Sequence, residues 1–85
     1  MEQKVMVMEI KERQSLIRTR VSTILQDSGL SQAAIADRMY IPANVICQYV
    51  HKQITPSPAR IAEICETFKE DPRWVLGLTD ERHKL

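Results

Sequence analysis

Two side chains with metal-binding chemistry lie four residues apart in the sequence. Cys47 and His51 would share one face of a helix, and thiolate and imidazole groups are both ligands of zinc. The other candidates are distant, because Cys65 belongs to a separate apolar stripe and His83 lies near the end of the chain. A structural zinc site needs about four ligands in one cluster. We therefore expect no metal and no other cofactor.

Residue patterns typical of catalysis are also missing. Gly29 and Gly77 are the only glycines, so no glycine-rich loop can cradle a phosphate group. No nucleophile, base and acid stand in an arrangement typical of a catalytic site. The sequence therefore favours a binding protein over an enzyme.

The remaining candidates are polar side chains on one predicted helix. If residues 43–51 are helical, the inward face carries Ile46, Tyr49 and Val50. The outward face is then polar and almost uncharged, and it presents Ala43, Asn44, Cys47, Gln48 and His51. Such side chains are most often simply solvated, so the pattern alone does not define a site.

Helices should position these residues, because apolar side chains recur at helical spacing. One apolar stripe runs through residues 17–25, and Gly29 can cap the end of that helix. Ser31 is a suitable N-cap for a second helix, and a third should run from about Ala43 to His51 after the proline at position 42.

Two further helices are each announced by a capping residue followed by proline. Ser57-Pro58 precedes an apolar stripe that ends at Phe68, and Asp71-Pro72 precedes a short helix that Gly77 ends. The prediction is an all-α fold, a compact five-helix bundle in one domain over residues 14–80. Residues 1–13 are either an N-terminal arm or the start of the first helix. Residues 81–85 form a tail, and the chain from Leu78 onward is expected to fray.

Composition is that of an ordinary globular protein, with 44% hydrophobic and 27% charged residues. No apolar run approaches the roughly 18 residues of a membrane span, and the first residues do not form a signal sequence, so we expect a cytoplasmic protein with reduced cysteines. The net charge is only +1, but residues 38–62 contain Arg38, Lys52 and Arg60 and no acid. An acid-free segment suits a surface that faces phosphates.

Residues 30–49 resemble the DNA-binding segment of the Cro and phage-repressor helix-turn-helix family, which is XRE-like. Gln32 matches the glutamine that opens the second helix, Ala36 the alanine where two helices touch, and Ile46 the buried aliphatic residue of the third helix. The resemblance extends over about residues 14–80. It implies the phage-repressor fold, in which the third helix enters the major groove of DNA.

The resemblance also implies which residues would touch DNA. Base contacts fall to Ala43, Asn44, Cys47 and Gln48, and contacts to the DNA backbone fall to Ser31, Gln32, His51, Lys52 and Gln53. Asparagine and glutamine can make paired hydrogen bonds to adenine, and a small apolar side chain suits the methyl group of thymine. Half-sites containing A and T are therefore expected.

Three residues depart from the family pattern. Tyr40 stands where the family has a glycine in the turn, Pro42 replaces a serine or threonine cap, and Lys52 replaces the glycine that ends the third helix. If the backbone at Tyr40 is left-handed, a residue other than glycine costs about 1 kcal/mol there.

A homodimer is expected, because one small module binds DNA weakly compared with two symmetric half-sites. The apolar residues near the C-terminus, Trp74, Val75, Leu76 and Leu78, are the predicted interface. The rival interface is the alternating stretch Val5–Met8, through strand exchange.

Two functions remain open at this point. The resemblance implies a sequence-specific transcriptional regulator of double-stranded DNA, a repressor of a phage or mobile element. The alternative is a protein-binding helix-turn-helix module, antirepressor-like or antitoxin-like, that does not read bases. The low charge and the three departures at Tyr40, Pro42 and Lys52 favour the alternative.

Overall fold

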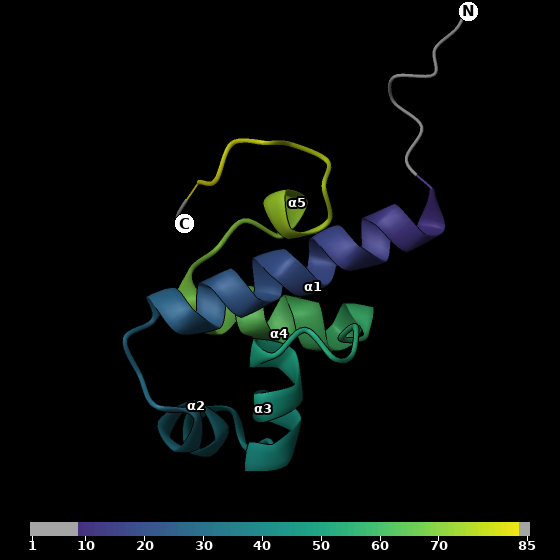
Figure 1. The fold of residues 1–85 in the computed structure, drawn as a ribbon. Coiled ribbons are helices and arrows are strands. Elements are labelled where there is room, and N and C mark those ends of the chain that lie inside the picture. The colour runs from purple at the N-terminus through teal and green to yellow at the C-terminus, as the bar shows by residue number, and fades with distance from the viewer. Residues whose placement is uncertain (1–8, 84–85) are drawn as a thin grey trace, which may run out of the picture.

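The computed structural model describes residues 9–83, and every helix in it follows a predicted one (Figure 1). The helices are α1 (Ile10–Asp27), α2 (Gln32–Met39), α3 (Ala43–Val50), α4 (Pro58–Phe68) and α5 (Pro72–Val75). No strand occurs among the described residues, so the predicted all-α class is confirmed. None of the described helices has the length and apolar character that a membrane span requires.

The first helix begins earlier than the apolar stripe alone indicates. Residues 10–13 belong to α1, whereas the predicted arm Val5–Met8 lies outside the described residues. A capping box starts the helix, because the backbone N–H of Glu9 donates to Oε1 of Glu12 at 3.2 Å while the Glu9 side chain accepts from the N–H of Glu12. A glutamate at the N-cap is a weaker sequence signal than serine or threonine.

Aliphatic side chains from every helix meet in one core. The most deeply buried ones are Val21, Ile24, Leu25, Ile35, Ile46, Ile61, Ile64 and Val75. Each buried side chain of this size contributes roughly 1.5 to 3 kcal/mol through removal of apolar surface from water. In Figure 1, α1 lies across α4, and α2 and α3 form a separate pair beneath them.

Polar contacts fix the ends of the shorter helices. Ser31 Oγ accepts from the N–H of Ala34 at 3.1 Å, and Ser57 Oγ accepts from the N–H of Arg60 at 3.2 Å. The side chain of Asp71 caps α5 by accepting from the N–H of Arg73 at 2.9 Å. The three predicted N-caps are thereby confirmed. Pro42 opens α3 without a side-chain cap.

Left-handed backbone occurs where the family pattern has glycine. Tyr40 ends α2 at φ 56° and ψ 42°, and Lys52 follows α3 at φ 62°. The Tyr40 ring gains nothing from burial, because 95% of the residue's surface is exposed. Lys69 also has a positive φ, at the end of α4, which the sequence did not indicate. α3 itself ends at Val50, one residue before the predicted end, and His51 is its C-cap.

The segment after α5 is held to the bundle by arginines. Arg82 donates to both carboxylate oxygens of the fully buried Glu70, at 3.1 and 2.7 Å, and to Asp27 at 2.7 Å. Its guanidinium lies 4.9 Å from the centre of the Trp74 ring, and that of Arg20 lies 4.8 Å from it. The expectation that the chain frays from Leu78 is therefore wrong for the part that reaches Arg82.

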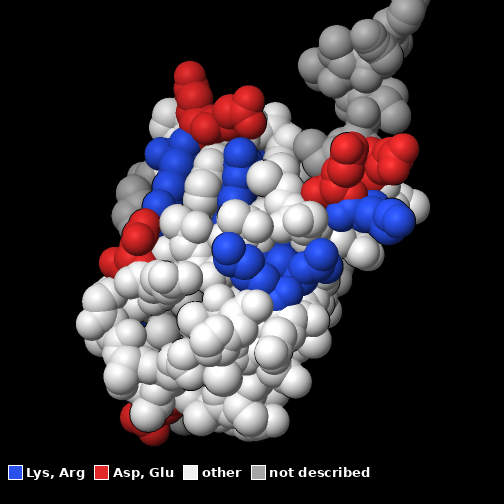
Figure 2. Space-filling view, in the orientation of Figure 1, with Lys and Arg blue, Asp and Glu red and all other residues white. Residues whose placement is uncertain are grey.

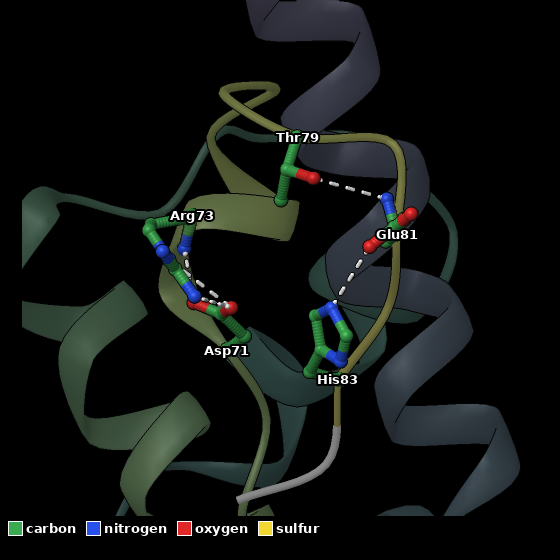
Figure 3. A network of polar contacts seen from close by, with 5 residues as sticks. All are labelled: Asp71, Arg73, Thr79, Glu81 and His83. Carbon is green, nitrogen blue, oxygen red and sulfur yellow. Dashed lines mark hydrogen bonds and ion pairs between the residues drawn. The ribbon is translucent and has the colours of Figure 1, made fainter.

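A second polar cluster surrounds the start of α5 (Figure 3). Arg73 Nη2 donates to Oδ2 of the buried Asp71 at 2.8 Å, and its Nε donates to both Asp71 oxygens at 3.2 Å. These side-chain hydrogen bonds, together with the backbone N–H of Arg73, lower the pKa of Asp71. Nearby, Thr79 Oγ1 accepts from the N–H of Glu81 at 3.2 Å, and the Glu81 carboxylate meets His83 at 3.1 Å.

The left-handed turn makes a prediction about stability. Tyr40→Gly should raise the free energy of unfolding by up to about 1 kcal/mol, because glycine adopts this backbone without the Cβ clash. Urea denaturation measures the change. Tyr40→Ala is the matched control: it removes the same exposed ring but keeps a Cβ, so it should not stabilise the protein. Equal stabilisation by alanine and glycine would contradict the backbone explanation.

The Asp71 cluster makes a prediction about pH. Because the folded-state pKa of Asp71 lies below the unfolded value of about 3.9, its stabilisation is present above that pH and is lost as the pH falls through the folded-state pKa. Asp71→Asn should therefore lower Tm at pH 7, and the gap to wild type should narrow below about pH 4. Asp37→Asn, at an exposed position in α2, is the control. A gap that stays constant from pH 7 to acid would refute the charge assignment.

Candidate nucleic-acid interface

One face of α3 collects the four residues predicted to contact bases. Ile46 and Tyr49 are buried against the core, so the opposite side of the helix points away from it. There, Ala43 and Asn44 are exposed and Cys47 and Gln48 are half-buried. Positions i, i+1, i+4 and i+5 lie on one side of an α-helix. The structure therefore brings these four side chains together.

The amides on this face are available to a ligand. Neither the Asn44 nor the Gln48 side chain forms a hydrogen bond with another residue in the described part of the chain. Both side chains keep one carbonyl acceptor and two N–H donors for a partner. This is the chemical content of the face, since Ala43 offers only a methyl group and Cys47 a thiol.

The predicted backbone contacts lie at two ends of the α2–turn–α3 unit. Ser31 is exposed and Gln32 half-buried at the start of α2, where the first backbone N–H groups have no partner within the helix. His51, Lys52 and Gln53 are all exposed just after α3. Their backbone is fixed, because the N–H of Gln53 donates to the Gln48 carbonyl at 2.8 Å and that of Lys52 to the Tyr49 carbonyl at 3.1 Å.

Charge is sparse over this unit. In Figure 2, the lower part of the molecule, where Figure 1 places α2 and α3, is almost entirely uncharged. Lys52 forms no ion pair with any of residues 9–83 and can therefore meet a phosphate. It is the cation directly next to the α3 face.

The acid-free segment of the sequence does not become an acid-free surface. Arg60 pairs with Glu63 at 3.2 Å, and Arg38 lines a shallow depression together with Glu63 and Glu66 of α4. Two of the three cations between residues 38 and 62 thus lie beside acids that the linear count placed just outside the segment. The expected positive surface is reduced to Lys52.

The predicted dimer interface requires a correction. Val75 is 0% exposed and Trp74 is also buried, so both side chains belong to the core of their own domain and cannot face a twin. The prediction assumed that α5 was too short to bury them, but α1 and the segment that follows α5 cover the indole, with Arg20 and Arg82 beside its ring. Leu76 stays half-buried and Leu78 exposed.

The two cysteines have different surroundings. Burial, reinforced by Glu70 and Asp71, raises the pKa of the Cys65 thiol to about 11, so this thiol is protonated at neutral pH. Cys47 is half-buried on the α3 face. Between residues 9 and 83, no three histidine, cysteine or acidic side chains gather as a metal site would require.

Comparison with known proteins gave no relative: no family model, curated protein or solved structure matches the chain. The resemblance to phage repressors therefore stays a prediction that depends on the residues quoted above. What it implies about DNA is treated below as a proposal, and its physical support is the geometry of α2 and α3.

The cysteine environments predict selective labelling. A maleimide should modify Cys47 in the folded protein, whereas Cys65 should react at least about tenfold more slowly because it is buried and protonated. Mass spectrometry after timed labelling measures both rates. Cys47→Ser should leave the folded protein almost unlabelled, and Cys65→Ser should label like wild type. Rapid labelling of the Cys47→Ser protein would show that Cys65 is accessible.

Proposed function

We propose that the protein binds double-stranded DNA as a sequence-specific transcriptional regulator, a repressor of a phage or mobile element acting in the cytoplasm. The observation that carries this proposal is the shared face of α3, where Asn44 and Gln48 keep their amide hydrogen-bonding groups for a ligand. The family resemblance of residues 14–80 supports the same conclusion.

The dimensions of α3 suit the major groove. Its eight residues span about 12 Å, and the major groove of B-DNA is about 12 Å wide. In this arrangement Asn44 and Gln48 each present an amide to adenine N6 and N7, and the Ala43 methyl meets a thymine methyl. The half-site should therefore contain A and T.

Contacts to the DNA backbone would hold α3 in register. Ser31 and Gln32 approach one strand with a hydroxyl, an amide and the partner-free N–H groups that begin α2. His51, Lys52 and Gln53 approach the backbone on the other side of α3. With Lys52 the cation directly beside the face, we expect a shallow salt dependence, of about one to three phosphates per subunit.

A protein-binding module without base readout is the second candidate. It is favoured by the uncharged surface of α2 and α3 in Figure 2 and by the exposed Tyr40 ring, which an aromatic-seeking protein surface would cover. Such a module has no reason to respond to phosphate screening.

A salt titration separates the two candidates. Binding to a fluorescent duplex of random sequence is measured by anisotropy between about 50 and 200 mM salt. A DNA-binding protein gives affinity that falls linearly with the logarithm of salt concentration. Absence of binding at the lowest salt, or binding with no salt dependence, would refute the DNA proposal and favour the protein-binding module.

Gln48→Ala tests base readout directly. With a duplex selected from a random library, the variant should lose about 1 to 3 kcal/mol of binding free energy, because a paired hydrogen bond to adenine is removed. Binding to random duplex should change little. Equal losses on the selected and random duplexes would contradict the assignment of Gln48 to a base.

Lys52→Ala is the matched control for Gln48→Ala. It should weaken binding to both duplexes alike and reduce the salt slope by roughly one unit for each phosphate contact removed. Thermal melting of both variants confirms that they remain folded, since both side chains point away from the core. An unchanged slope would place Lys52 outside the interface.

A further inference from the structure

A groove of about 470 Å³ lies at the other end of α1 from the α1–α2 turn. Its walls come from three segments far apart in the sequence: the first half of α1, the turn that precedes α4, and the residue after α5. The lining is mostly apolar, with Ile10, Ile17, Pro56, Ile61 and Leu76 among its residues. None of the residues proposed to contact DNA lines it.

The groove is built into the fold by contacts between its walls. Arg13 Nη1 donates to the Leu76 carbonyl at 3.1 Å, which joins α1 to the end of α5. Arg18 Nη1 donates to Thr55 Oγ1 at 2.8 Å, which joins α1 to the turn before α4. A surface held in this way is largely preformed, so a partner binds it without the entropic cost of ordering it.

Exposed apolar side chains gather at this groove. The large hydrophobic residues that stand out in solvent, within the part of the chain that the structure describes, are Ile10, Tyr40, Ile54 and Leu78. Ile10 lines the groove and is 76% exposed, and Ile54 directly precedes its lining residue Thr55. Leu78 is 64% exposed and lies two residues after Leu76. Apolar surface thus extends past the groove on both sides.

The turn that carries Leu78 is fixed against α1. A Cβ built on Gly77 would lie 2.8 Å from Cδ2 of Leu16, so this part of the chain sits directly on the helix, one turn from Arg13. Leu76 and Leu78 therefore flank a point of close contact with α1. Their apolar surface and that of Ile10 belong to the same side of the helix bundle.

From these observations we propose that the groove is a self-association surface, in which a second copy of the chain seats the Ile10 end of its α1. A small molecule or a short arm would fill the groove and leave Ile54 and Leu78 in water. A second copy covers the groove and its banks together. Ile10 both lines the groove and projects from it, as a residue in a two-fold contact must.

The charges at the start of α1 fit the same partner. Glu9, Lys11, Glu12 and Arg13 place two acids and two bases within five residues, and Figure 2 shows acidic and basic side chains adjoining where α1 begins. Two such ends that meet antiparallel bring the acids of one copy to the bases of the other. This proposal does not depend on DNA binding, and its test contains no DNA.

Sedimentation equilibrium of the full chain tests the proposal, with loading from about 5 to 500 µM. Wild type should show a monomer–dimer equilibrium. Ile10→Asp should raise the dimer dissociation constant at least about tenfold, and Leu78→Asp should raise it in the same direction. Aspartate at the first residue of α1 is compatible with the helix, because acidic side chains favour helix N-termini. Thermal melting then confirms that both variants fold.

Tyr40→Asp is the matched control, because it places the same charge on an exposed hydrophobic residue away from the groove and should leave the dimer unchanged. Three results would overturn the proposal: a wild type that stays monomeric at the highest concentration, a dimer insensitive to both groove variants, and equal weakening by Tyr40→Asp. Deletion of residues 1–8 distinguishes strand exchange. If that deletion yields monomers while Ile10→Asp remains dimeric, the stretch Val5–Met8 is the interface and the groove is not.

Discussion

The inward face of α3 packs against α1, and this burial sets the direction of every other side chain on α3. Ile46 and Tyr49 lie in the core, and the Ser22 hydroxyl of α1 donates to the Val50 carbonyl at 2.6 Å, so the end of α3 is tied to the long helix. Since Ser22 is itself fully buried, this bond also satisfies a polar group that would otherwise destabilise the core. The outward amides are positioned as a consequence.

Residues with left-handed backbone bound the α3 segment on both sides. Tyr40 and Lys52 accept a conformation that glycine would adopt more easily, at a cost of about 1 kcal/mol each. At Lys52 the side chain supplies a cation beside the α3 face, which glycine could not. At Tyr40 nothing in the described structure offsets the cost, since the ring is exposed.

The arginines around Trp74 determine which surfaces remain available to partners. Arg20 and Arg82 lie over the indole, and Arg20 also donates to the carbonyl of Trp74 and to that of Thr79 at 3.1 Å. α5 is consequently anchored to its own domain although it has only four residues. The apolar surface left over lies at Ile10, Ile54 and Leu78, around the groove at the start of α1.

Sequence alone determined the helices, their caps and the outward face of α3, because these depend on short-range rules. Apolar spacing defines a helix face, and serine or aspartate before proline marks a helix start. Tertiary structure decided what lies beside what. It buried Trp74 and Val75, returned Arg82 to Glu70, and set Glu63 beside Arg60, so that the acid-free stretch of sequence is not an acid-free surface. Such outcomes depend on contacts between segments distant in the chain, which residue spacing does not encode.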